Sequence, residues 1–174
     1  AALNFSILDL DYMEEIKQFK CLTDLREIIS ELDGFYARPT VRGQHPTLYP
    51  EVSDGRYRTV CGIRVCDYTL SEDGQWVLPD DQMGLSFSSS WQHLKSAHKM
   101  VSRGAGKDVD VFWVLSRADI PSGMSFQQDQ RASKSAKGHY LLTVNERMKI
   151  SSLVEKLKWI ADRMSVIKDA GGAL

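Results

Sequence analysis

Gly84-Leu85-Ser86-Phe87-Ser88-Ser89-Ser90-Trp91 is the stretch from which the fold interpretation starts. Its two apolar residues alternate with serines, which is the two-residue period of a strand with one apolar face and one hydroxyl-bearing face. Ser89 or Ser90 then caps a helix that begins near Trp91. The stretch predicts a hydroxyl-rich junction between a strand and a helix, a place where small ligands are often held. A strand followed by an ordinary helix cap is the simpler alternative.

The size and charge of the chain narrow the class of protein. The chain has 174 residues, 43% of them hydrophobic, which suits one compact domain with a packed core. Its 22 basic and 23 acidic residues give a formal net charge of −1, so there is no global attraction to nucleic acid or to an anionic membrane. No apolar run reaches the length of a membrane span, and no secretion signal is visible. We therefore expect no membrane insertion.

Three cysteines, Cys21, Cys61 and Cys66, are an odd number in a chain of this size. An odd number argues against a disulfide framework and favours a reducing, cytoplasmic place of action. We interpret Cys61 and Cys66 as small core residues. Cys61 and Cys66 have no second Cys or His pair at metal-finger spacing, so no metal site is expected.

Hydrophobic periodicity predicts helices at both ends of the chain and strands between them. Apolar residues at three-and-four spacing predict a helix from about Leu10 to Leu32, and a second such stripe predicts a helix capped by Ser151 or Ser152 that continues to about Ala170. We expect an α+β protein with a helical extension over residues 1–34 and one compact unit over residues 35–174. The strands predicted between the helices are 40–42, 57–65, 75–78, 84–88, 109–115, 124–130 and 139–144.

Several polar segments could carry chemistry. Arg42 beside Gly43 could bring a bidentate guanidinium to a phosphate, although an exposed loop arginine is the common alternative. His139, followed by Tyr140, could act as an acid, a base or a ring donor, or could be a purely structural histidine. The segment Gln127-Gln128-Asp129-Gln130 could hold sugar hydroxyls or stabilise a developing cation, or could be a solvated turn.

Other motifs point less clearly to a chemistry. The glycine patterns of phosphate-binding and dinucleotide-binding loops are absent. A hydrolase built from Ser88, His139 and Asp129 lacks the turn that presents a nucleophilic serine. The basic loop from Arg131 through Lys134 to Lys137 could touch a phosphate backbone, which would make the chain a nucleic-acid-directed protein.

Read in chain order, the segments resemble small type VI secretion effector toxins with an ADP-ribosyltransferase-like fold, and their fungal relatives. The resemblance covers roughly the last two-thirds of the chain. It implies a split, mostly antiparallel sheet flanked by helices. The matching segments are Gly84–Phe87, Phe112–Leu115, Asp119–Met124, Gln128–Asp129, Gly138–Tyr140 and the helix through Leu153 and Leu157.

The resemblance also implies a function and a set of site residues. As in ADP-ribosyltransferases, an early arginine, a serine strand and a late polar-acid segment follow one another in this chain. NAD would be the substrate, with Gln128, Asp129 and His139 catalytic. The late acid is Asp129 where the family pattern has Glu. The residues implied to bind NAD are Arg42, Gly43, Ser86, Ser88, Ser89, Ser90 and Tyr140, with Arg38 and Arg64 as alternatives for the pyrophosphate.

The biological setting that the resemblance implies is an intracellular toxin. Such an effector is exported without a signal peptide, modifies a protein or nucleic-acid target in the cytoplasm of another cell, and is neutralised by a cognate immunity protein. Two alternatives stay open. One is a nucleic-acid-directed toxin or RNA-binding module that uses the Arg131–Lys137 loop. The other is a catalytically inactive domain of the same fold that acts by binding.

Overall fold

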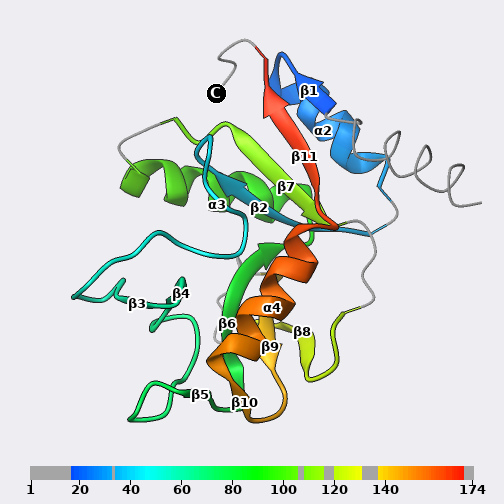
Figure 1. Cartoon of the computed structure of the whole chain (residues 1–174). Helices are drawn as coiled ribbons and strands as arrows, with labels where there is room; N and C mark the ends of the chain where they lie inside the picture. The colour runs from blue at the N-terminus through cyan, green and yellow to red at the C-terminus, as the bar shows by residue number, and fades with distance from the viewer. Residues whose placement is uncertain (1–16, 33, 106–107, 116–119, 131–136, 171–174) are drawn as a thin grey trace, which may run out of the picture.

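A seven-stranded sheet forms the centre of the molecule in a computed structural model that describes residues 17–32, 34–105, 108–115, 120–130 and 137–170 (Figure 1). The strand order is β1-β11-β7-β2-β6-β9-β8, and every neighbouring pair is antiparallel except β1 with β11. The sheet strands are β1 (Lys17–Phe19), β2 (Tyr36–Thr40), β6 (Asp80–Ser88), β7 (Val111–Leu115), β8 (Met124–Gln128), β9 (His139–Val144) and β11 (Ser165–Asp169).

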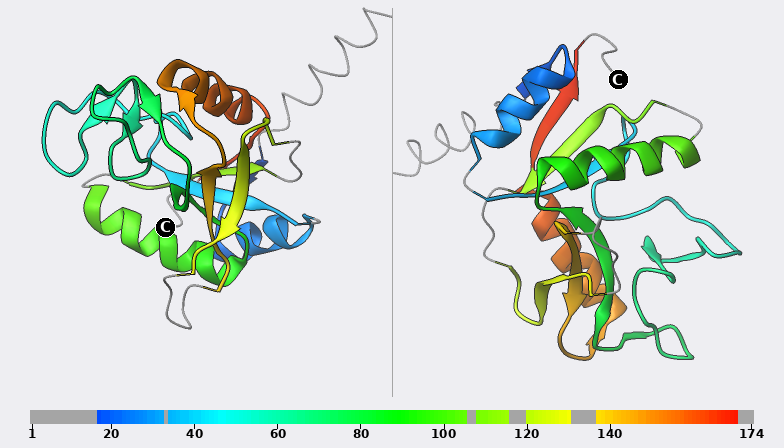
Figure 2. Two further views of the ribbon diagram at one scale, coloured as in Figure 1. Left: turned by 90° about the horizontal axis from the view of Figure 1, so that it is seen from below. Right: turned by 180° about the vertical axis from the view of Figure 1, so that it is seen from behind.

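Helices cover both faces of this sheet. The helices are α2 (Leu22–Ser30), α3 (Trp91–Ala105) and α4 (Ile150–Ala161). Figure 2 shows α4 on one face and α2 with α3 on the other. Two short pairs lie outside the main sheet, β3 (Thr59–Val60) with β4 (Ile63–Arg64) and β5 (Trp76–Val77) with β10 (Met148–Lys149). The prediction of an α+β protein with a mostly antiparallel sheet is therefore confirmed.

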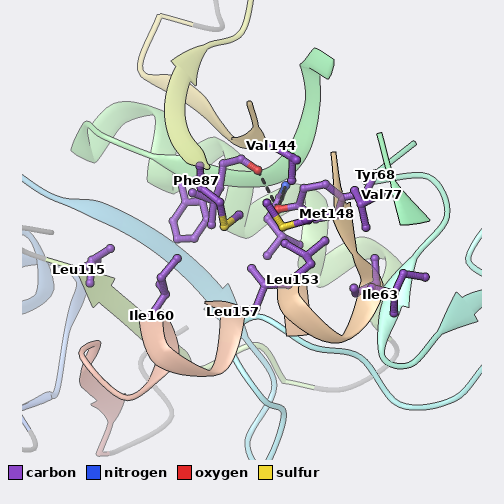
Figure 3. Packing of buried hydrophobic residues seen from close by; sticks show 14 of the residues in the cluster. Ile63, Tyr68, Val77, Phe87, Leu115, Val144, Met148, Leu153, Leu157 and Ile160 are labelled. Atoms are coloured by element: carbon purple, nitrogen blue, oxygen red, sulfur yellow. Dashed lines mark hydrogen bonds between the residues drawn. The ribbon is translucent and has the colours of Figure 1, made fainter. Parts of the chain in front are cut away.

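Two clusters of buried side chains make up the core. The larger one packs α4 against the sheet, with Leu153, Leu157 and Ile160 beneath Phe87 and Val144 (Figure 3). The smaller one packs α2 and α3 against the other face and includes Phe19, Leu25, Leu94, Phe112 and Ile167. None of the helices in the described residues is long and apolar enough to span a membrane.

The serine stretch folds as predicted. Leu85 and Phe87 are buried in the larger core cluster, and β6 ends at Ser88. Ser90 then caps α3, because its Oγ accepts a hydrogen bond of 3.2 Å from the backbone N–H of His93. The predicted junction between a strand and a helix is confirmed.

The predicted N-terminal helix is too long. Helix α2 begins only at Leu22, and residues 17–19 form strand β1, which pairs with β11. Phe19 is completely buried and contacts Phe112 edge-to-face with ring centroids 5.8 Å apart. Tertiary burial of Phe19 thus overrides the helical period there. The predicted residues before Lys17 lie outside the described residues.

The predicted C-terminal helix is also too long. Helix α4 ends at Ala161, and the chain turns back as β11, in which Ile167 is buried. Its apolar residues continue the helical spacing by coincidence, because pairing with β7 decides the structure of this segment. The helix begins after Lys149 with no side-chain cap, so neither predicted serine caps it.

The strand predicted at residues 40–42 is displaced. Strand β2 lies earlier, at Tyr36–Thr40, and contains Pro39. Proline lacks an N–H and is tolerated in a strand where no neighbour needs that donor. β2 pairs with β6 only at Ala37, so Pro39 lies beyond that pairing, although it stays in register with Phe112 on β7. Arg42 is therefore a loop residue, and Arg38 is the arginine on the strand.

The cysteines do not lie in the core. Cys21 and Cys61 are exposed, and Cys66 is partly buried. Cys61 adopts a positive φ of 55° in the turn between β3 and β4. The interpretation of Cys61 and Cys66 as core residues was wrong.

Candidate functional site

Strand register brings three distant segments to one place. Ala37 on β2 pairs with Ser88 on β6, and Ser88 pairs with His139 on β9. A cavity of about 540 Å³ opens beside this row, between the strands, helix α3 and the segment around β3 and β4. The residues that line it are Ala37, Arg38, Pro39, Tyr49, Tyr57, Arg64, Asp67, Ser86, Phe87, Ser88, His93, Ser96, Ala97, Met100, Val101 and His139.

Asp129 fixes the orientation of the His139 ring through a contact with Nδ1. The backbone N–H of Asp129 donates to the carbonyl of His139 at 2.9 Å, which continues the pairing of β8 with β9. This places the Asp129 Oδ2 atom 2.9 Å from Nδ1 of His139. The contact favours a proton on Nδ1 and leaves Nε2 as the acceptor. Among the residues that the structure describes, Nε2 has no hydrogen-bond partner, although it is buried.

A second histidine lies against the first. The rings of His93 and His139 stack with centroids 4.9 Å apart and an interplanar angle of 11°. His93 Nδ1 is 2.6 Å from Oγ of Ser88. Burial lowers the pKa of His93, and the neighbouring His139 lowers it further, while Asp129 acts in the opposite direction. His93 is therefore held neutral near physiological pH.

Arg38 supplies the buried positive charge. Its Nε donates to the Pro46 carbonyl at 2.9 Å, and its terminal nitrogens donate to the Ser86 carbonyl and the Tyr49 hydroxyl, each at 2.6 Å. These bonds fix the guanidinium against two separate segments of the chain. A guanidinium has five N–H groups, so both terminal nitrogens of Arg38 keep a second N–H. Those donors suit an anionic group such as a phosphate.

The structure brings together some of the predicted site residues. Ser86, Ser88 and His139 line the cavity, and Asp129 contacts His139. Ser90 stands next to them as the cap of α3. Arg42 does not meet Ser88 and His139 in this cavity, so its assignment as the arginine of the site is wrong, and Arg38 lines the cavity instead.

Other predicted site residues lie elsewhere. Arg42 pairs with Asp110 at 2.8 Å and, like Gly43, borders shallower hollows outside the cavity. Tyr140 contacts the ring of Tyr36 at 5.5 Å instead of lining the cavity.

Two further assignments, Ser89 and Gln128, also fall outside the cavity. Ser89 borders a separate hollow near α2. Gln128 is exposed on the edge strand β8. Of the predicted basic loop, Arg131 and Lys134 lie outside the described residues, and Lys137 is exposed.

Sequence reasoning missed His93 and Asp67. His93 stands five residues after Ser88, at the start of the predicted helix, and that spacing could have indicated a histidine that folds back on the serine. Asp67 has no comparable signal, because it lies in an irregular segment whose path is decided by packing.

No group of three or more His, Cys, Asp or Glu side chains suited to a metal ion occurs in the part of the chain that the structure describes. Comparison of the chain with protein-family models, with curated protein sequences and with solved structures gives no match.

Proposed function

We propose that this cavity binds NAD and that the chain transfers ADP-ribose to a target or cleaves NAD, as an ADP-ribosyltransferase-like enzyme. The observation that carries the proposal is that Arg38, Ser88 and His139, from the three adjacent strands β2, β6 and β9, line one cavity. The ADP-ribosyltransferase order of an early arginine, a serine strand and a late polar-acid segment supports the proposal, with Arg38, Ser88 and Asp129 in that order.

The first step of the proposed reaction is binding of the pyrophosphate. Arg38 offers its remaining N–H groups to the phosphate oxygens, and its own bonds to Pro46, Ser86 and Tyr49 hold it ready. A donor that is already oriented loses little conformational freedom on binding, so more of the interaction energy contributes to affinity.

The second step is cleavage of the bond between the ribose and nicotinamide. Nicotinamide leaves as a neutral molecule with the bonding electron pair, and positive charge develops on the ribose. Water, or a nucleophilic group of the target, forms the new bond to the same ribose carbon and must lose a proton. Nε2 of His139 is suited to accept it, and the Asp129 carboxylate stabilises the imidazolium that forms.

Because His139 acts as the base in this proposal, Asp129 has a different role from direct stabilisation of the ribose cation. In this proposal Asp129 does not contact the ribose, and its shorter side chain relative to Glu matters less than its bond to Nδ1. Gln128 has no part in the reaction, because it is exposed on β8. The setting of a cytoplasm-acting effector toxin with a cognate immunity protein follows from the resemblance and belongs to the same proposal.

The proposal is tested by incubating the purified chain with NAD labelled in its adenylate part, with and without cell lysate. We expect release of nicotinamide or transfer of label to a macromolecule. Substitution His139→Gln should lower the rate by about 100-fold or more, because the proton acceptor is lost. Asp129→Asn should lower it by at least about tenfold through loss of ring orientation.

Arginine variants supply a matched control. Arg38→Lys keeps the charge but loses the planar donor set, and should weaken NAD binding about tenfold. Arg42→Ala removes an arginine four residues away that lies outside the cavity, and should bind NAD as the unsubstituted chain does. Absence of both NAD consumption and label transfer with the unsubstituted chain would rule out the activity. Equal losses in both arginine variants would rule out the site.

A further inference from the structure

One side of the cavity carries polar atoms that the protein itself leaves unsatisfied. Within the described residues, four buried side-chain atoms have no hydrogen-bond partner, and three of them belong to residues that line this cavity. Besides Nε2 of His139, these are Nε of Arg64, a donor, and Oδ2 of Asp67, an acceptor. Leaving such atoms unpaired is costly in a folded protein, so a ligand that pairs with them gains affinity.

Arg64 is held in place by aromatic rings. Its guanidinium lies 3.6 Å from the ring centroid of Tyr49 and 4.8 Å from that of Tyr57. Such contacts fix the plane of the group and leave its edge to form hydrogen bonds. Asp67 is three residues further along, and its backbone N–H donates to the Arg64 carbonyl at 3.1 Å. Arg64 and Asp67 are therefore tied to each other by a local turn.

Apolar side chains gather around the same cavity. Five large apolar side chains are exposed in the part of the chain that the structure describes, and three of them, Tyr57, Met100 and Val101, line this cavity. Tyr57 comes from the segment before β3, and the other two come from α3. Exposed apolar surface concentrated at one cavity marks a place where an apolar or aromatic face is bound.

We propose that Arg64, Asp67 and Tyr57 bind a planar nitrogen heterocycle that has a hydrogen-bond donor beside an acceptor on one edge. The ring face packs on Tyr57, the acceptor receives the N–H of Arg64, and the donor pairs with the Asp67 carboxylate. The carboxamide of nicotinamide and the amino edge of adenine both have this pattern. The inference rests on the proposed function in one respect: nicotinamide and adenine are taken as the candidate heterocycles because NAD contains both.

The pattern makes a sharp distinction between close analogues. Nicotinic acid replaces the amide donor with a carboxylate oxygen, which cannot donate to Asp67, and inosine reverses the donor and acceptor of adenosine. Loss of a hydrogen bond to a charged group corresponds to about a tenfold or greater loss of affinity. A pocket that selects only by shape and apolar contact would bind the two members of each pair alike.

The experiment measures binding of nicotinamide, nicotinic acid, adenosine and inosine to the full chain by ligand-observed NMR. We expect preference for nicotinamide over nicotinic acid if the carboxamide is bound here, or for adenosine over inosine if adenine is bound here. Asp67→Asn should reduce that preference to about threefold or less, because an amide both donates and accepts. Asp54→Asn, an exposed aspartate of the same segment outside the cavity, is the matched control.

The outcomes separate this inference from the proposed function. Equal binding within both pairs, a preference that Asp67→Asn leaves unchanged, or no binding of any of the four compounds would overturn the inference. NAD cleavage combined with any of these results would leave the proposed function standing alone. Preference lost in Asp67→Asn without NAD cleavage would uphold the recognition site and reject the enzymatic proposal. Arg64→Lys is a second variant, which keeps the cation but removes the Nε–H. It should lower the affinity for the preferred ligand.

Discussion

Side chains at the cavity contact partners on neighbouring strands and on helix α3. Asp129 bonds His139, Ser88 bonds His93, and the two imidazoles stack. Each histidine therefore uses one ring nitrogen for a protein contact. At the residue scale, the lowered pKa of His93 favours its neutral form. The two stacked imidazoles therefore need not both carry a charge.

The lowered pKa of His93 predicts a dependence of stability on pH. The unfolded chain binds a proton on this residue at an ordinary pKa of about 6.5, whereas the folded chain binds it only at lower pH. Between those two values the unfolded state holds more protons, so the free energy of unfolding falls as the pH falls. We expect His93→Gln to lose less stability than the unsubstituted chain between about pH 7.5 and about pH 5.

Denaturant unfolding at each pH measures this effect. Burial also lowers the pKa of His45, which is present in both the unsubstituted chain and His93→Gln. The difference between their free energies of unfolding at each pH therefore reports on His93. Parallel pH profiles for the two proteins would contradict the prediction.

Among the elements, the contact between β6 and β9 is the one that positions the site. The register shifts between Asp80 and Leu85, and Gly84 lies at this irregularity. A Cβ on Gly84 would collide with the backbone carbonyl of Leu142 on β9. The two strands can approach this closely only with glycine at position 84.

We expect Gly84→Ala to lower the free energy of unfolding by about 2 kcal/mol or more, because a backbone atom cannot move aside as a side chain can. Gly104→Ala is the control, since a Cβ there meets no atom within 4 Å and alanine favours helix α3. It should be neutral or stabilising by up to about 1 kcal/mol. Equal stability of the two variants in denaturant titrations would show that β6 and β9 do not approach closely.

Across the whole molecule, residues 17–32 contribute to the same sheet and core as the later strands and helices. β1 extends the sheet through β11, and Phe19, Leu25 and Ile29 belong to the smaller core cluster. The described part of this segment is therefore built into the fold that carries the cavity.

We expect Phe19→Ala to lower the free energy of unfolding by about 3 to 5 kcal/mol, as for other completely buried phenylalanines. Leu22→Ala, at a position that is 43% exposed, should cost less than about 1 kcal/mol. Both values come from denaturant unfolding followed by circular dichroism. A Phe19→Ala variant as stable as Leu22→Ala would mean that this segment is not part of the cooperative core.

Local patterns were enough to predict several elements. The period of two at residues 85–88 indicated β6, and His139–Val144 was predicted with the bounds that β9 has. Helix α3 and the Ser90 cap also followed from nearby residues. These elements are predictable because alternation, helical spacing and capping act over a few neighbouring positions.

Packing between distant segments decided the rest. Ile167 continues a helical stripe in the sequence, but pairing with β7 makes it part of a strand. Arg42 and Arg38 carry the same guanidinium, and only the position of β2 against β6 places Arg38 in the cavity. The contact of Asp129 with His139 likewise depends on strand register. The position of Asp67 at the cavity depends on the path of its loop. Neither has a local signature, because the free energy that sets them comes from burial and hydrogen bonding across the whole sheet.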